Sequence, residues 1–142
     1  MRTGAIAGAA TTAIVAACGA AEDGEAIAPV NAVSHIAWGD EAARQTAIST
    51  KYTLTGLVLN AAAVTSWAVI YHALFGGRKI TPLAAATGAV ATSALAYVTD
   101  YHVVPERLTP GFEKRLSNRS LALTYGVLAA GLMVGGLLAR RR

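Results

Sequence analysis

The sequence predicts an all-α fold: an integral membrane four-helix bundle with short amphipathic interfacial helices in its two outer loops. Hydrophobic residues make up 54% of the 142 residues and charged residues only 14%, and the mean hydropathy is +0.46. A soluble domain usually carries about 25% charged residues. The few charges also leave four long windows without any Asp, Glu, Lys or Arg. We therefore expect residues 1–142 to form a single four-span membrane domain.

Three of these windows are long and apolar enough to cross a bilayer. They are residues 54–75, 80–98 and 120–139, and a helix needs about 20 mostly apolar residues to cross. In hydrocarbon every backbone N–H and C=O must pair within the protein, which favours helices. The middle helix can continue to Val104, because Pro105 follows and stops it. Its predicted span is therefore residues 80–104.

The first window, residues 4–21, consists mostly of Ala, Gly and Thr, and it has two interpretations. As a retained helix it gains little from lipid and packs against the other spans. Alternatively, it is the core of a secretion signal that begins at Arg2. The stretch from Val15 to Cys18 then resembles a bacterial lipoprotein cleavage box, so that residues 1–17 are removed and Cys18 is lipidated. We favour the retained helix, and the sequence leaves the second interpretation open.

Basic residues predict the orientation, because cytoplasmic loops keep an excess of Lys and Arg. One side of a four-span arrangement collects six basic residues and no acids: Arg2, Arg78, Lys79, Arg140, Arg141 and Arg142. The other side collects six basic residues and all eight acids. We therefore expect a bacterial inner-membrane protein with both termini in the cytoplasm. The six basic residues on the first side are accounted for as determinants of membrane orientation. The pI near 9.6 therefore does not predict a nucleic-acid partner.

Two segments between the spans predict the interfacial helices. Pro29 begins a stretch with helical apolar spacing, residues 29–39, which can lie at the membrane interface or tuck among the spans as a re-entrant helix. A second short helix is expected after Thr109, with Phe112 and Leu116 dipping into lipid. Its basic residues would then meet lipid phosphates: Lys114, Arg115 and Arg119.

Small and polar residues predict how the helices pack. Close contact between helices in lipid depends on small residues, and the candidates are Gly4, Gly8, Gly88, Gly131 and Gly135. In span 54–75 a polar stripe at helical spacing is expected to face the bundle interior, and it contains Asn60, Trp67 and Tyr71. The glycine pairs predict ordinary packing within the chain, and a homodimer or a larger membrane complex stays open.

A metal site is one interpretation of the histidines and carboxylates at the outer boundary of the spans. His35 and His102 fall at the outer boundary of the spans together with Asp100 and Glu106. Imidazole and carboxylate groups bind divalent metals, but these ligands come from separate segments without tight spacing. Haem would need two facing histidines, for which only His35 and His102 qualify. The main expectation is that these histidines bond loop backbone and that no cofactor is bound.

The residues predict no catalytic site. No carboxylate lies near the centre of a predicted span, which separates this chain from four-helix exporters that use a membrane-embedded glutamate. No nucleophile motif of the G-x-S-x-G type and no phosphate-binding glycine loop occurs. We therefore expect a protein that is not an enzyme, and the sequence leaves any cofactor-binding residues unknown.

Two stretches together carry a resemblance to a known group. APVNAVSHIAWGDEAA (28–43) and VVPERLTPGFE (103–113) each precede a predicted span. The arrangement resembles a group of small, uncharacterised proteobacterial four-helix inner-membrane proteins. The resemblance covers most of the chain and implies a bacterial membrane setting, but that group has no established activity and adds no site residue.

Three functions follow as expectations. The first is a structural or accessory, non-catalytic role in the membrane. The second is a small transporter or channel, as a monomer or a dimer, whose polar path follows the Asn60 stripe. The third is a metal- or haem-binding membrane protein that uses His35 and His102.

Overall fold

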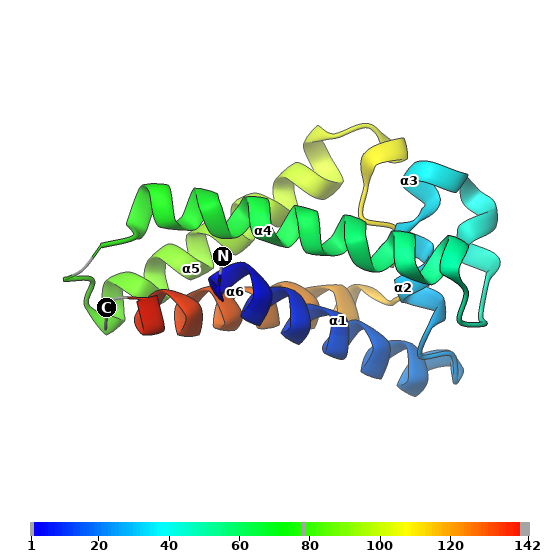
Figure 1. Ribbon diagram of the computed structural model, residues 1–142, viewed down its shortest axis with the longest axis horizontal. Helices are drawn as coiled ribbons and strands as arrows, with labels where there is room; N and C mark the ends of the chain where they lie inside the picture. Colours follow the sequence, from blue (N-terminus) through cyan, green and yellow to red (C-terminus); the bar gives the residue numbers. More distant parts are fainter. Residues whose placement is uncertain (1, 78, 140–142) are drawn as a thin grey trace.

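The computed structural model describes residues 2–77 and 79–139, and all of the regular elements in this part of the chain are helical (Figure 1). The long helices are α1 (Arg2–Asp23), α4 (Thr55–Phe75), α5 (Pro82–Val98) and α6 (Asn118–Ala139). The short α-helices are α2 (Ala28–Val33) and α3 (His35–Trp38). Three 3₁₀ turns, η1 (Asp40–Arg44), η4 (Glu106–Leu108) and η5 (Phe112–Lys114), and two π turns, η2 (Thr50–Leu54) and η3 (Thr99–Val103), complete the set.

Four helical stretches are long and apolar enough to cross a membrane. They are Arg2–Asp23, Thr50–Phe75, Pro82–Val103 and Asn118–Ala139. The predicted all-helical class and the four long apolar helices are therefore confirmed. Of the basic residues that predict the orientation, Arg78 and Arg140 to Arg142 lie outside the described residues.

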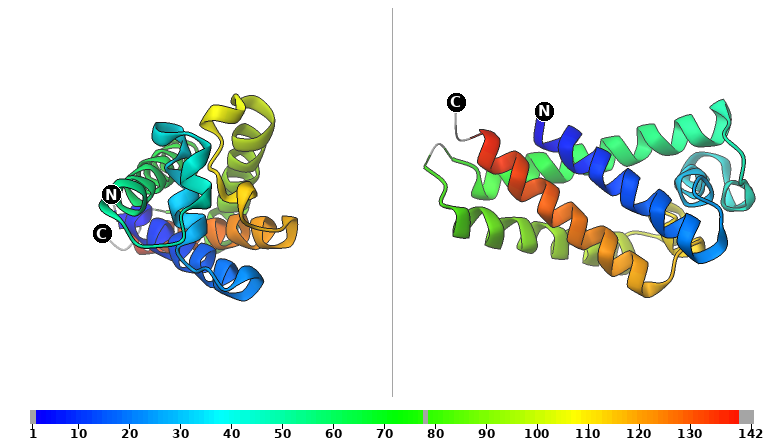
Figure 2. Two further views of the ribbon diagram at one scale, coloured as in Figure 1. Left: turned by 90° about the vertical axis from the view of Figure 1, so that its right-hand side faces the viewer. Right: turned by 90° about the horizontal axis from the view of Figure 1, so that it is seen from below.

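Consecutive long helices run in opposite directions along one bundle (Figures 1 and 2). Helix α1 packs against α4 and α6, and α5 packs against the same two helices. The bundle has a turn end, where residues 76–81 connect α4 to α5, and a loop end, where α2, α3 and η1 pack together with η4 and η5. These two names are used below.

Alanine is the most frequent residue of the apolar core, which also holds several leucines and valines. Tyr71 and Leu132 are completely buried against alanines of α1, α4 and α5. Large apolar side chains point outward instead, such as Val58, Val69 and Leu83, each more than half exposed. A bundle that buries alanine and exposes leucine and valine is suited to an apolar surrounding, because association of helices in lipid depends on close packing of small residues.

Four of the five predicted packing glycines lie at close helix contacts. A Cβ on Gly131 would lie 2.6 Å from the Cα of Ala7, and a Cβ on Gly135 would lie 2.6 Å from the Cα of Thr3. A Cβ on Gly4 would meet Thr65, and one on Gly88 would meet Phe75, both under 3.0 Å. Gly8 differs, since its nearest neighbour is Val64 at an ordinary 3.9 Å. Gly131 and Gly135 therefore serve the α1–α6 contact within the chain.

The segment predicted over residues 29–39 is tucked into the loop end of the bundle. Every residue from Ala28 to His35 is buried, and only the last part, with Trp38 at 48% exposure, reaches the surface. Its approach to α4 is close, because a Cβ on Gly56 would collide with the carbonyl oxygen of Val30. Of the two positions that the sequence leaves open, the structure has the buried one.

The prediction of a lipid-facing helix around residues 109–116 is wrong. Gly111 takes a left-handed conformation with φ of +89°, and only the short turn η5 follows it. Phe112 and Leu116 consequently point into the bundle, where they join a second core cluster with Val15 and Val30. The predicted phosphate ligands Lys114 and Arg115 pair with Asp40 and Asp23 instead, and Arg119 is exposed.

Candidate functional site

A cavity of about 90 Å³ lies at the loop end, between α4, η3 and α6. Most of its wall is apolar and includes Phe112 and Leu108. Its polar lining comes from Asn60 of α4, Asp100 of η3, Tyr125 of α6 and two threonines, Thr11 and Thr124, and Trp67 of α4 adds a further aromatic ring. This combination of a carboxylate, a carboxamide and three aromatic rings in an apolar wall is the candidate functional site.

Asp100 reaches the cavity because α5 ends in a π turn. In η3 the Val104 amide donates to the Thr99 carbonyl at 3.0 Å, five residues back, and such turns often occur at functional sites. Asp100 is half-buried, and its Oδ2 accepts a 2.6 Å hydrogen bond from the Tyr125 hydroxyl. Asp100 also lies within electrostatic range of Glu113.

Two other tyrosines, Tyr97 and Tyr101, pack against the ring of Tyr125. The ring centroids of Tyr97 and Tyr125 lie 5.3 Å apart in an edge-on arrangement, and Tyr101 and Tyr125 lie 6.0 Å apart in the same way. Edge-to-face pairs of this kind are favourable because of the ring quadrupole. The cluster fixes the ring of Tyr125, and with it the direction from which Asp100 is bound.

The predicted polar stripe of α4 divides between the cavity and the core. Asn60 Nδ2 donates to the Thr12 hydroxyl at 3.1 Å, and both Asn60 and Trp67 line the cavity. Tyr71, further toward the turn end, is completely buried and donates to the Ala85 carbonyl at 3.3 Å. Asn60 and Trp67 thus belong to the candidate site, whereas Tyr71 belongs to the buried core between that site and the turn end.

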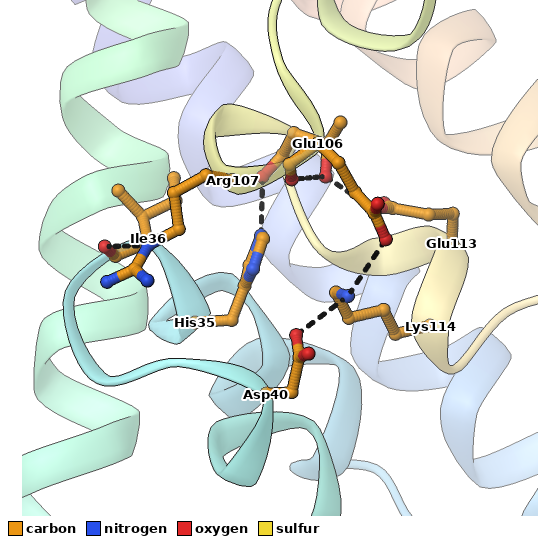
Figure 3. A network of polar contacts seen from close by, with 8 residues as sticks. His35, Ile36, Asp40, Glu106, Arg107, Glu113 and Lys114 are labelled. Atoms are coloured by element: carbon orange, nitrogen blue, oxygen red, sulfur yellow. Dashed lines mark hydrogen bonds and ion pairs between the residues drawn. The ribbon is translucent and has the colours of Figure 1, made fainter.

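The four predicted metal ligands do not form one group. His35 Nε2 donates to the Thr109 carbonyl at 2.7 Å (Figure 3), while His102 is exposed beside the Tyr97 ring. Asp100 is bound to Tyr125, and Glu106 lies 3.9 Å from the Lys114 ammonium. Within residues 2–77 and 79–139, no three His, Cys, Asp or Glu side chains are grouped so that they could hold a metal ion. Asp100 and His102 share the turn η3, but Asp100 is bound to Tyr125 whereas His102 is exposed, and His35 and Glu106 belong to other segments.

Polar side chains at the loop end instead tie its segments to one another (Figure 3). Lys114 binds Asp40 at 3.0 Å, and the Arg107 Nε donates to the Ile36 carbonyl at 3.0 Å. The Thr109 hydroxyl contacts both the Glu106 carbonyl and the Glu113 carboxylate. The hydrogen bond and the charge of Lys114 lower the pKa of Asp40.

The end of α1 is fastened to the start of α6 in a similar way. Glu22 accepts hydrogen bonds from the backbone N–H and the hydroxyl of Ser117, and also from the Ser120 hydroxyl. Arg115 binds Asp23 at 2.6 Å beside it. A carboxylate at a helix N-terminus satisfies free N–H groups and complements the helix dipole.

Sequence reasoning missed the Asp100–Tyr125 pair and took Asp100 only as a boundary metal ligand. The one signal for it was that the predicted span 80–104 already includes Asp100. No protein-family model, no curated protein and no solved structure matches the chain.

Proposed function

We propose that this protein is a small integral inner-membrane protein with a structural or accessory, non-catalytic role, whose four long helices cross the bilayer. The observation that carries the proposal is the number of large apolar side chains on the outside of the four long helices, such as Val58, Val69 and Leu83, around a core in which alanine is the most frequent residue. In water this surface would be a large exposed apolar patch, which soluble monomers rarely carry. In a bilayer it is the expected surface.

The charges support an orientation with the turn end in the cytoplasm. All eight acids lie on the segments of the loop end: Glu22, Asp23, Glu25, Asp40, Glu41, Asp100, Glu106 and Glu113. The described residues Arg2 and Lys79 lie toward the turn end. The loop end carries six Lys and Arg residues of its own, so the turn end differs by having no acids; we place this net-positive end in the cytoplasm by analogy with the positive-inside rule.

The use of the polar groups at the loop end supports the structural part of the proposal. His35 ties α3 to the segment before η5, Asp40 ties η1 to η5, and Glu22 ties the end of α1 to the residues that precede α6. A loop end whose segments are bonded to one another is what a membrane scaffold or an accessory subunit would present to a partner.

Alkaline extraction and reporter fusions test the proposal together. We expect the expressed protein to stay in the membrane pellet after a carbonate wash. Alkaline phosphatase fused within residues 46–49 should be active, because that enzyme needs the periplasm, and the same reporter at the C-terminus should be inactive. Release of the protein by carbonate, or an active C-terminal fusion, would overturn it.

A transporter or channel is the second candidate, favoured by one observation: Asn60 and Trp67 line the cavity. The buried Tyr71 lies between that cavity and the turn end, so passage would require its displacement. Flux measured in proteoliposomes with the wild type and Asn60→Leu decides this candidate. A flux that Asn60→Leu abolishes supports it, and an equal flux in both proteins removes it.

A further inference from the structure

The carboxylate in the cavity lacks a counter-ion. The ion pairs of the described residues join Lys114 to Asp40 and Glu106, and Arg115 to Asp23, and none of them includes Asp100. Its Oδ2 is bound by the neutral Tyr125 hydroxyl. Glu113 adds a second negative charge within electrostatic range. A half-buried carboxylate in an apolar wall is unfavourable unless a cation or strong donors compensate it, so the cavity is suited to a cation.

The remaining wall indicates which kind of cation fits. Trp67 and Tyr125 line the same cavity as the carboxylate, and aromatic rings attract organic ammonium groups through their quadrupoles. The Nδ2 of Asn60 donates a hydrogen bond to the Thr12 hydroxyl, which leaves the Oδ1 of Asn60 as an acceptor. A Ca²⁺ ion would take 6–8 oxygen ligands and Mg²⁺ demands a near-ideal octahedron. A mostly apolar wall with one carboxylate does not supply those ligands.

The volume of the cavity and its opening to the surface limit which cations it can hold. About 90 Å³ is several times the roughly 10–15 Å³ that admits a single water molecule. The cavity therefore accepts a group of a few non-hydrogen atoms, such as a methylated ammonium. Leu108, which lines the cavity, is 52% exposed, so the rim opens at the loop end.

We propose that this cavity binds a small organic ammonium group, with Asp100 as its counter-ion and Trp67 and Tyr125 as its aromatic wall. This function goes beyond the structural role proposed above and does not depend on transport. The ammonium can belong to a free cation or to the headgroup of a lipid at the surface of the membrane, since both present the same chemistry at the rim.

Fluorescence of Trp67 reports on the site directly. The chain has two tryptophans, and Trp38→Phe leaves Trp67 as the only one. The full-length variant, in phosphatidylglycerol nanodiscs, is titrated with tetramethylammonium chloride. We expect a saturable change in Trp67 emission that sodium chloride at equal ionic strength and neutral tert-butanol do not produce. No saturable change by about 100 mM, a hundred times a millimolar Kd, overturns the proposal, and so does an equal response to tert-butanol.

Matched carboxylate variants identify the counter-ion. Asp100→Asn keeps an oxygen for the Tyr125 hydroxyl but removes the charge, and we expect it to raise the Kd at least about tenfold. Glu106→Gln removes an exposed carboxylate of the same end outside the cavity and should leave the Kd unchanged. Equal Kd values for Asp100→Asn and the parent overturn the assignment. Because the parent titration needs no change at Asp100, it keeps the proposal testable if that variant fails to fold.

The lipid composition of the nanodisc distinguishes the two sources of the ammonium. If a lipid headgroup occupies the site, phosphatidylcholine added to the phosphatidylglycerol disc shifts the tetramethylammonium titration to higher concentration. If the ligand is a free cation, the titration is the same in both discs. Either result supports an ammonium site and assigns its source.

Discussion

Asn31 and Thr53, 22 residues apart, are joined by a buried hydrogen bond of 2.6 Å in which the Thr53 hydroxyl donates to Asn31 Oδ1. The Nδ2 of the same side chain donates to the carbonyls of Gln45 and Ala47, at 3.0 and 2.9 Å. One completely buried carboxamide thus joins α2 to η2, the π turn that leads into α4, and to the loop before that turn. Since its donors and acceptor are all used, Asn31 holds the buried α2 in position without leaving an unpaired polar group.

Replacing Asn31 should destabilise the protein strongly. Asn31→Leu has a similar volume but leaves two carbonyls and one hydroxyl without their partner, and we expect a loss of about 2–4 kcal/mol in the free energy of unfolding. The measurement is denaturant-induced unfolding in detergent micelles. Gln45→Ala is the control, because it keeps the carbonyl that accepts from Asn31, and it should change stability by less than about 0.5 kcal/mol. Equal stability of Asn31→Leu and the wild type would contradict the role of Asn31.

Two glycines of α6 should respond to alanine in opposite directions. Gly131→Ala places a methyl group against the backbone of Ala7, so α1 must shift from α6, at a cost of about 1–3 kcal/mol. Gly126 lies on the same helix with nothing within 4 Å of an added Cβ. Gly126→Ala should therefore be neutral or stabilise the protein by up to about 1 kcal/mol through helix propensity. Thermal unfolding of the two variants is the measurement, and equal shifts in Tm would show that the α1–α6 contact is not close.

Helix α1 should remain in the mature protein. It contributes Ala7 to one core cluster and Val15 and Cys18 to the other. Removal of α1 would therefore expose the remaining residues of both clusters. We expect the intact mass of the purified protein to include α1 and to carry no lipid on Cys18. Cys18→Ala is the control, and it should change the mass only by the substitution itself. A mass that lacks residues 1–17 and includes an acyl adduct would support the lipoprotein interpretation instead.

The Asp40–Lys114 pair should give the loop end a weak dependence on acid. The pKa of Asp40 is lowered in the folded protein, so the pair favours folding above the ordinary aspartate pKa. That contribution is lost as the pH falls through the folded-state pKa. Asp40 is exposed, and exposed pairs stabilise little, so the local pKa is a better measurement than stability. In an NMR titration Lys114→Gln should raise the pKa of Asp40, and Lys51→Gln should leave it unchanged. An unaltered pKa in Lys114→Gln would contradict the pairing.

The class of fold was predictable because it depends on local composition. A charge-free window of about 20 residues has one stable form in hydrocarbon, the helix, and four such windows predict the four long helices that the structure has. The positions of most packing glycines were predictable for a related reason, since small residues at helical spacing mark close contacts. Gly8 shows the limit, because its spacing is right but its neighbour Val64 lies at an ordinary distance.

The candidate site was less predictable. Asn60 and Trp67 were expected to face inward, but their partners across the cavity were not identified. Asp100 lies near the end of its helix, where sequence alone places a carboxylate in the headgroup region. The π turn η3 changes the direction of this side chain and joins it to Tyr125, 25 residues away. Hydrophobic periodicity does not reveal such a turn.

The amino-acid sequence alone determined the four apolar helices, because the lengths of the charge-free windows predict them. The short connections and the positions of the charges likewise determined the alternating directions of the helices and the grouping of the acids at one end. Tertiary packing alone decided that α2 is buried, that Phe112 and Leu116 point inward and that Asp100 meets Tyr125. An apolar side chain near a membrane surface can leave water either for lipid or for protein. The close fit of Val30 against Gly56 and the left-handed turn at Gly111 make the protein interior the available place.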